Sequence, residues 1–224
     1  MKAIRVVLLI CCLTGQLASL PAMAQAPERT LASEHFRVIF PARADERLAA
    51  EALRILEAAS ARTKRVFETA GMRFPLREHT QLKVYATTGD FCGATGQPAW
   101  AGAVTRGAHM HAQPLQTLKK RGALETTLRH EFTHVVLEVA NHGRTPRWLA
   151  EGLAIHMAGE AALYTKAGGD KPPDQQTLER ELQQPAKQVT PARMRMLYAQ
   201  SWREVKRLLD TDGEAAVWRR AAGQ

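Results

Sequence analysis

One segment of the sequence restricts the fold more than any other, because it combines an amphipathic helix with a pair of histidines. His130 and His134 lie in this segment, which ends near Asn141 and Gly143. Its apolar residues recur at helical spacing, at Leu124, Leu128, Phe132, Val135, Val136 and Val139. On a helix, positions i and i+4 lie one turn apart on the same face. Both imidazoles can therefore reach one metal ion.

Glu131 completes the pattern His130-Glu-Phe-Thr-His134. Its carboxylate can face a metal-bound water and take its proton as a general base. Zinc is the expected ion, because it suits a nitrogen-rich, four-coordinate site and lowers the pKa of its water to about 7. The alternative is two ordinary helix histidines beside a solvated glutamate, which a third ligand would disfavour.

Glu151 is the predicted third metal ligand. It lies on the next predicted helix, where Thr145 is the expected N-cap and Pro146 the first helical residue. A short turn before that helix lets the two helices pack antiparallel and brings the carboxylate back toward the histidines. Gly152, directly after Glu151, marks a place where another helix could approach closely.

Three other interpretations of these side chains remain open. A surface position on its helix is the alternative for Glu151, and the following Gly152 favours the ligand. His142 is a rival ligand that lies too close to the turn, and His156 is a rival on a different helical face. Either would become the third ligand if Glu151 were not.

The two motifs together resemble a known family. His130–His134 followed by Pro-Arg-Trp-Leu-Ala-Glu-Gly-Leu-Ala at 146–154 is similar to the gluzincin metallopeptidases, and most similar to the bacterial peptidase MA-like group. Tyr-Ala-Gln-Ser at 198–201 resembles a helix that follows the site in that group. The resemblance extends over roughly residues 34–220 in outline. It implies a zinc peptidase in which a small strand layer lies over the active-site helix and substrate backbone lies along an edge strand.

The sequence departs from this pattern at one position. Some gluzincins place an acid four residues after the glutamate ligand to orient a histidine, and here that position is Ile155. The partner that fixes the tautomer of a ligand histidine must then come from elsewhere. Tyr198 is the candidate donor to the oxyanion, with packing of its own helix as the alternative.

His109 and His111 share one face of a predicted strand and could bind a metal or line the cleft. Exposed histidines on an edge strand are the preferred interpretation. Cys92 is expected to be a small buried side chain. Trp100 is a candidate for the cleft wall, with core packing as the alternative.

The order of elements predicts an α+β fold: a small N-terminal mixed sheet with helices, the active-site helix and a helical C-terminal half. This zincin-like catalytic unit is expected to be one domain over residues 25–224. Strands are predicted at 35–40, 81–86, 100–104 and 108–112, with loops around the last two in the glycine-rich span 89–107. Helices are predicted at 44–69, from 122 onward, from Thr190-Pro191, and after a cap at Asp212, with a loop over 167–175.

Residues 1–24 predict a cleaved signal peptide. Lys2 and Arg5 precede a short apolar stretch, and Ala22-Met23-Ala24 is a small-x-small cleavage site. The apolar stretch is shorter than the roughly 20 residues that span a bilayer, so no stable membrane span is expected after cleavage. The expected location is periplasmic or secreted.

The formal net charge of +9 permits contact with anionic envelope polymers. Nucleic acid is not an expected partner, because no dense Lys/Arg run with interleaved aromatics is present.

The sequence as a whole predicts a zinc-dependent metallopeptidase, with His130, His134 and Glu151 as ligands, Glu131 as general base and a peptide or protein as substrate. One rival is a zinc amide hydrolase acting on peptidoglycan stem peptides. A second rival is a catalytically idle, zinc-stabilised binding module. The presence of Glu131 argues against the second, because a purely structural zinc has no use for that carboxylate.

Overall fold

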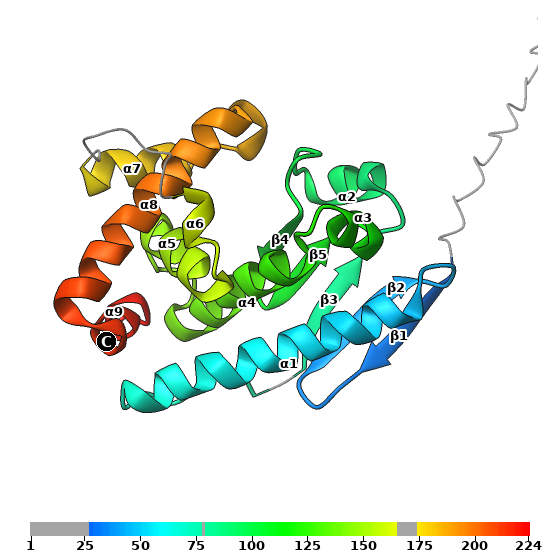
Figure 1. The fold of residues 1–224 in the computed structure, drawn as a ribbon, viewed down its shortest axis with the longest axis horizontal. Helices are drawn as coiled ribbons and strands as arrows, with labels where there is room; N and C mark the ends of the chain where they lie inside the picture. The colour runs from blue at the N-terminus through cyan, green and yellow to red at the C-terminus, as the bar shows by residue number, and fades with distance from the viewer. Residues whose placement is uncertain (1–26, 78, 165–173) are drawn as a thin grey trace, which may run out of the picture.

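The computed structural model describes residues 27–77, 79–164 and 174–224, and the predicted signal peptide lies outside these ranges (Figure 1). The strands are β1 (Glu28–Ala32), β2 (Phe36–Pro41), β3 (Thr80–Val84), β4 (Ala103–Arg106) and β5 (His109–Ala112). The helices are α1 (Glu46–Thr69), α2 (Thr88–Thr95), α3 (Leu115–Lys120), α4 (Leu124–Asn141), α5 (Arg147–Ala158), α6 (Ala161–Tyr164), α7 (Gln175–Leu182), α8 (Pro191–Asp212) and α9 (Glu214–Ala221), with a 3-10 turn at Ala186–Gln188. The predicted α+β class is confirmed.

The strands form one mixed sheet in the order β1-β2-β3-β5-β4. β2, β3 and β5 run parallel, while β1 and β4 are antiparallel to their neighbours. Val38, Leu82 and Met110 lie opposite one another across the three parallel strands, and all three are fully buried. This apolar row fixes the strand register, because a slip of one residue would turn every side chain to the other face. β4 is left at an edge of the sheet.

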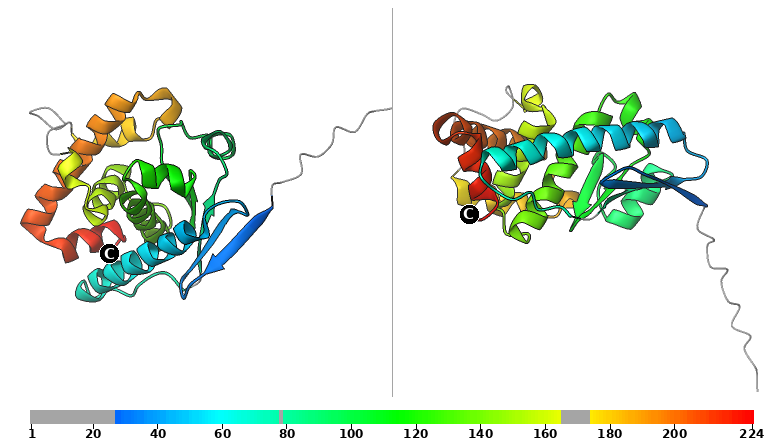
Figure 2. Two further views of the ribbon diagram at one scale, coloured as in Figure 1. Left: turned by 45° about the vertical axis from the view of Figure 1, so that its right-hand side comes forward. Right: turned by 90° about the horizontal axis from the view of Figure 1, so that it is seen from below.

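Two long helices, α1 and α4, lie side by side on the apolar face of the sheet (Figures 1 and 2). α1 begins where the side chain of Asp45 accepts a hydrogen bond from the backbone N of Arg47, an ordinary N-cap. The rings of Phe36 on β2 and Phe132 on α4 meet edge to face, with centroids 5.3 Å apart. The core therefore holds the motif-bearing helix α4 against the sheet.

The C-terminal helices form a second layer around α5. α5 packs between α4 and α8, and α7 packs on α5 and α8. α9 returns to α1, where the rings of Phe67 and Trp218 lie 5.4 Å apart. Asn141 and Thr145, at the turn between α4 and α5, both donate hydrogen bonds to the carbonyl of Ala221. The α4–α5 turn is therefore tied to the C-terminal end of α9.

The glycine-rich span 89–107 contains a helix that the sequence did not predict. α2 begins with a capping box, in which Thr87 and Asp90 each bond the other's backbone N–H. The predicted strand at 100–104 is displaced, because β4 starts at Ala103 and runs to Arg106. Cys92 is a free thiol on α2 and is half-buried, not buried.

Two predicted helix caps are also wrong. Thr145 does not cap α5, since its hydroxyl donates to Ala221 and the N-cap residue is Pro146. Asp212 is the last residue of α8, and Gly213, with φ of 80°, separates α8 from α9. The predicted cap at Thr190 is confirmed, because its side chain accepts from the backbone N of Arg193.

The predicted loop over 167–175 lies outside the described residues as far as 173, and α7 begins at its last residue, Gln175. In the part of the chain that the structure describes, no helix has the length and apolarity to cross a bilayer.

Candidate metal centre

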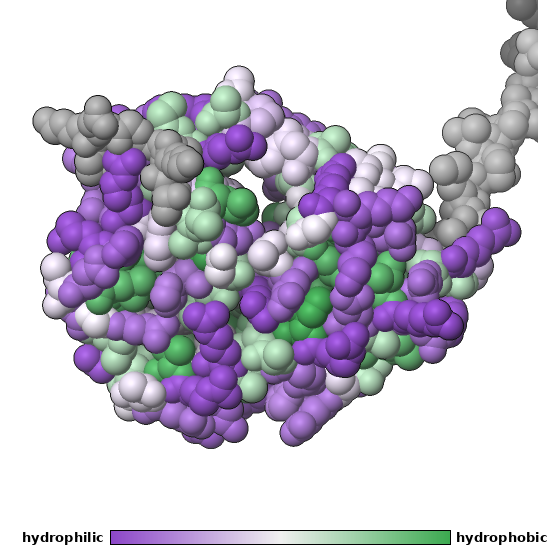
Figure 3. Space-filling model, viewed as in Figure 1, coloured by the Kyte–Doolittle hydropathy of each residue, from purple (hydrophilic) through white to green (hydrophobic). Residues whose placement is uncertain are grey.

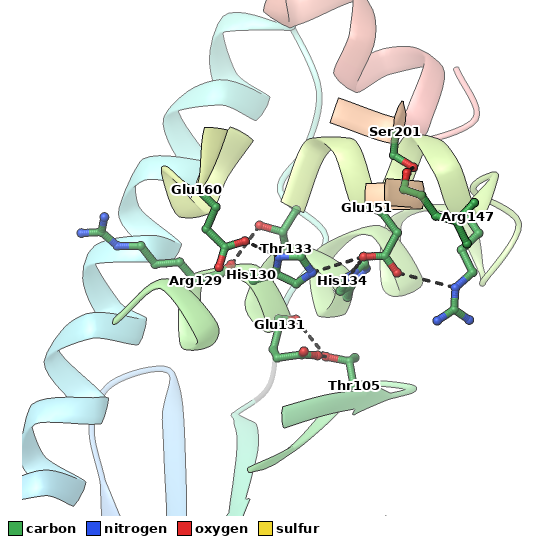
Figure 4. Close-up of polar contacts among 11 residues, drawn as sticks. Thr105, Arg129, His130, Glu131, Thr133, His134, Arg147, Glu151, Glu160 and Ser201 are labelled. Carbon is green, nitrogen blue, oxygen red and sulfur yellow. Dashed lines mark hydrogen bonds and ion pairs between the residues drawn. The ribbon is translucent and has the colours of Figure 1, made fainter. Parts of the chain in front are cut away.

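The two histidines of α4 and the glutamate of α5 meet at one point. Oε2 of Glu151 lies 3.3 Å from Nε2 of His130 and 3.4 Å from Nε2 of His134 (Figure 4). The ligand atoms of the three residues all lie within 4.8 Å of one another. His130 and Glu151 are buried, and His134 is half-buried. The predicted ligand set is thus brought together, and it forms a group that could hold a metal ion.

The separations within this group fit metal coordination better than they fit ion pairs. Two ligands of a tetrahedral ion, each about 2.0–2.1 Å from it, are about 3.3–3.4 Å apart. A charge-assisted N–H···O bond is shorter, about 2.7–2.9 Å. Both measured distances from the Glu151 oxygen fall on the first value. The Glu151 oxygen is therefore spaced from each histidine nitrogen as two ligands of one small ion would be.

Glu151 reaches this point because α5 is held on both sides. The chain reverses direction at His142 and Gly143, which both have positive φ, so that α5 packs back along α4. On its other side, α5 touches α8 at Gly152. A Cβ at this glycine would lie 2.4 Å from Cγ2 of Val205 and 2.6 Å from the carbonyl O of Ser201. The close approach predicted for Gly152 is present, and it holds the ligand helix against α8.

Charges inside the group keep the ligand carboxylate ionised. Burial would raise the pKa of Glu151, but the charge of His134 and the hydrogen bonds from both histidines outweigh it and hold that pKa well below its usual range. Burial would likewise lower the pKa of His130, but its hydrogen bonds to Glu151 and Glu160 hold it well above the usual value. The carboxylate is therefore present in the form that binds a metal.

Glu131 turns toward the sheet and is held there by β4. Its Oε2 accepts a hydrogen bond from the hydroxyl of Thr105, at 2.8 Å, and the same hydroxyl lies 2.9 Å from the carbonyl of Glu131 (Figure 4). The residue is buried and adjoins the ligand His130 in the chain. Glu131 thus lies in the cleft with its carboxylate held by Thr105, and it is the residue that the sequence predicted as general base.

Glu160 is a site residue that the sequence did not predict. Its Oε2 accepts a hydrogen bond from Nδ1 of His130, at 3.0 Å, on the side of the ring away from Glu151 (Figure 4). Gly159, with φ of 76°, ends α5 in a left-handed turn and lets the following residue face back to α4. Ile155, at the position where an acid was sought, is fully buried in the core. The sequence feature that marks Glu160 is its place directly after Gly159, the residue that ends α5.

Tyr198 lies at the same site, on α8. Its ring centroid is 6.2 Å from that of His130, and 6.2 Å from that of Tyr164. Burial and the negative charge of Glu151 raise the pKa of its hydroxyl well above the usual value. The phenol therefore stays protonated and is available as a hydrogen-bond donor.

A cleft of about 390 Å³ opens over the group. Its lining includes Val104 and Thr105 of the edge strand β4, Trp100 before that strand, and Gln183 directly after α7. Figure 3 shows the surface hollowed between the part over α7 and α8 and the part over α2 and β4. Trp100 lines this cleft and is 40 % exposed, so it does not pack in the core.

The other histidines that were weighed as ligands lie elsewhere. Nδ1 of His111 is hydrogen-bonded to the hydroxyl of Tyr85, at 3.0 Å, and the pKa of His111 is lowered by burial and by the charges of Arg106, His109 and Lys83. Its strand β5 lies between β3 and β4, so the prediction of an edge strand for this histidine pair is wrong.

His156 belongs to a separate cluster. Its Nε2 pairs with Glu214, at 2.9 Å, and its ring stacks on Trp202. His142 ends α4 in the left-handed conformation. Within the described ranges, none of the rival histidines joins the group formed by His130, His134 and Glu151.

Comparison of the chain with models of known protein families, with curated proteins and with solved structures gives no match in any of the three. The function of the site has to be inferred from its own geometry.

Proposed function

We propose that the protein is a zinc-dependent peptidase. The observation that supports this most strongly is the pair of separations from the Glu151 oxygen, 3.3 and 3.4 Å, which match neighbouring ligands of a tetrahedral ion. Two imidazoles and one carboxylate are a usual donor set for catalytic zinc, which keeps a fourth position for water. The group faces a cleft, so that position is open to a substrate.

The residues around the group supply the remaining parts of a hydrolytic site. Zinc held here would lower the pKa of its water to about 7 and polarise a carbonyl. Glu131 takes the proton of the attacking water and passes it to the leaving nitrogen. Tyr198 donates a hydrogen bond to the carbonyl oxygen as negative charge develops on it.

The edge strand β4 explains how a peptide would lie in this site. Its outer side carries no partner strand among the described residues. Its residues Val104 and Thr105 line the cleft beside the metal group. An extended peptide can add to such an edge by backbone hydrogen bonds, which would carry an amide bond past Glu131.

The predicted signal peptide adds a location to the proposal, periplasmic or secreted. The experiment that tests the metal site is elemental analysis of purified protein for wild type, His134→Ala and Glu151→Ala. One zinc per chain in the wild type, lost or much weakened in both variants, is the expected result. Zinc retained in Glu151→Ala would contradict the ligand set, and no zinc in the reconstituted wild type would overturn the proposal.

Catalysis is tested separately with Glu131→Gln. This variant keeps the shape of the side chain but cannot accept the proton, so it should bind zinc and fail to hydrolyse peptides. A wild type that binds zinc and shows no hydrolysis dependent on Glu131 would favour the idle binding module.

A further inference from the structure

The cleft has a charge composition opposite to that of the chain. The whole sequence carries 31 Lys and Arg against 22 Asp and Glu. Among the described residues, the cleft is lined by a single Lys or Arg, Arg147, and by four acids: Glu131, Glu138, Glu151 and Glu179. The position of Arg147, a single basic residue in an acidic cleft of a basic protein, therefore needs a structural explanation.

Part of the reason for the position of Arg147 is its contact with Glu151 of the metal group. Arg147 is the first residue of α5, one turn before Glu151, and its Nε lies 3.6 Å from Oε1 of that ligand. The other oxygen of Glu151, Oε2, is the one that faces the histidines. Arg147 therefore stands on the far side of the ligand carboxylate from the metal position.

This contact uses little of the hydrogen-bonding capacity of Arg147. A guanidinium has five N–H donors, of which only one is on Nε. The terminal nitrogens point away from Glu151 (Figure 4) and make no hydrogen bond within the described residues. The side chain is 54 % exposed and lines the cleft. The two terminal nitrogens are thus presented to whatever the cleft binds.

We propose that Arg147 binds a carboxylate of the substrate close to the scissile bond. The planar fork of a guanidinium matches a carboxylate in a bidentate pair. Glu138 and Glu179, the two acids of the cleft outside the proposed catalytic group, would repel a carboxylate placed near them, which favours the position beside Arg147. The inference rests on the proposed peptidase function and adds to it a class of substrate.

Distance limits which carboxylate this is. The guanidinium lies within roughly 10 Å of the metal position, the length of about three extended residues at 3.3–3.6 Å each. The carboxylate therefore belongs to the C-terminus one to three residues beyond the cleaved bond, or to an Asp or Glu side chain within that distance on either side of the bond. The first source makes the enzyme act near chain ends, and the second makes it cut beside acidic residues.

The test uses three libraries of N-acetylated peptides, made as C-terminal free acids, as C-terminal amides, and as amides with Asp or Glu at varied positions. Cleavage by the zinc-loaded wild type is followed by mass spectrometry. We expect peptides with a suitably placed carboxylate to be cleaved about 10- to 100-fold faster than those without, the range expected for a hydrogen-bonded charge pair. Preference for free acids identifies the C-terminus, and preference for acidic amides identifies the side chain.

Variants of Arg147 show whether this residue causes the preference. Arg147→Met should remove it, Arg147→Lys should keep part of it, and the zinc content of both should equal that of the wild type. Arg54→Met, a loss of the same charge from an exposed position on α1, is the matched control and should keep the full preference.

Two results would overturn the inference while leaving the peptidase function intact. One is equal cleavage of all three libraries by the wild type. The other is an equal fall for every library in Arg147→Met, which would mean that Arg147 only holds Glu151 in place. Absence of cleavage of every library by the zinc-loaded wild type would overturn the proposed function instead.

Discussion

His130 is held from both sides by carboxylates: its Nδ1 lies 3.0 Å from Glu160, and its Nε2 lies 3.3 Å from Glu151. A metal bound here would take the place of the Nε2 proton of His130, and the bond to Glu160 would keep the other proton on Nδ1. Glu151 lies within α5, and Glu160 follows that helix directly after Gly159. α5 and the turn that ends it therefore supply a proposed metal ligand and the residue that orients another.

Replacing Glu160 should weaken zinc binding without removing any ligand. We expect Glu160→Ala to lower zinc affinity by about 10- to 100-fold, the usual effect of losing the hydrogen-bond partner of a metal-binding histidine. Glu160→Gln, which keeps an acceptor, should lose less. The measurement is competition with a chelator of known affinity.

Glu214→Gln is the control for Glu160, because it removes the acid from another His–Glu pair, that of His156. It should leave zinc affinity unchanged. Equal affinities for wild type and Glu160→Ala would show that Glu160 has no part in the metal site.

Gly152→Ala should destabilise the protein by about 1–3 kcal/mol, the usual cost of overpacking. The added methyl would meet the backbone carbonyl of Ser201 at 2.6 Å, which cannot rotate away. Zinc affinity should fall as well, because the neighbouring Glu151 moves with the helix. Urea unfolding and chelator competition measure the two effects.

The matched control is Gly93→Ala on α2, where a Cβ meets nothing within 4 Å. There the substitution should stabilise the protein by up to about 1 kcal/mol through helix propensity. A Gly152→Ala protein as stable as the wild type would mean that α5 and α8 can separate at no cost.

Thr105→Val should slow hydrolysis while the zinc content stays at the wild-type level. The valine keeps the shape and the strand preference of threonine but cannot donate to Glu131. Loss of one such bond to a charged group costs about 1.5 kcal/mol or more, which is roughly a tenfold fall in kcat/KM. Thr105→Ser retains the hydroxyl and should recover most of the rate. An unchanged rate in Thr105→Val would show that Glu131 is oriented without it.

Glu57 on α1 predicts a pH dependence of stability. Burial would raise its pKa, but hydrogen bonds from Ser33 and from the backbone and ring of His35 outweigh it and hold the pKa below its usual value. A carboxyl with a depressed folded-state pKa contributes stability above the unfolded pKa of about 4.3, and loses it as the pH falls through the folded value. The stability gap between wild type and Glu57→Gln should therefore narrow from about pH 5 to pH 3.

Urea midpoints across this range measure the gap for Glu57. Glu34→Gln serves as control, because its side chain is 83 % exposed beside the same histidine. A gap for Glu57→Gln that stays constant with pH would contradict the assignment.

The features that the sequence could predict are those encoded by local spacing. The stripe on α4 and the cap at Thr190 specify their helices within a few neighbouring residues. Predicting that His130 and His134 lie together required only that they share one face of a helix. Predicting that Glu151 joins them required only a short turn between two helices. These elements formed as expected because helical periodicity and short connections leave few alternatives.

The contacts that the sequence could not predict join segments distant along the chain. Thr105 meets Glu131 only because β4 is the edge strand beside α4, and the strand order is not visible in the periodicity of either segment. The glycines of α2 favour loops, and only the capping box of Thr87 and Asp90 marks the start of this helix. Threonine is a common N-cap residue, yet the hydroxyl of Thr145 donates instead to the carbonyl of Ala221, near the end of the sequence.

The close packing of α5 and α8 at Gly152 means that the metal group can form fully only after α8 has been synthesised. Before α8 has been synthesised, the chain already contains both histidines and Glu151. The side of α5 that faces away from α4 then lacks its packing partner α8. We expect a chain that ends at residue 190 to bind zinc far more weakly than the full chain, which chelator competition would show. A zinc peptidase of the proposed kind would then become active only after α8 had been synthesised and had packed against α5.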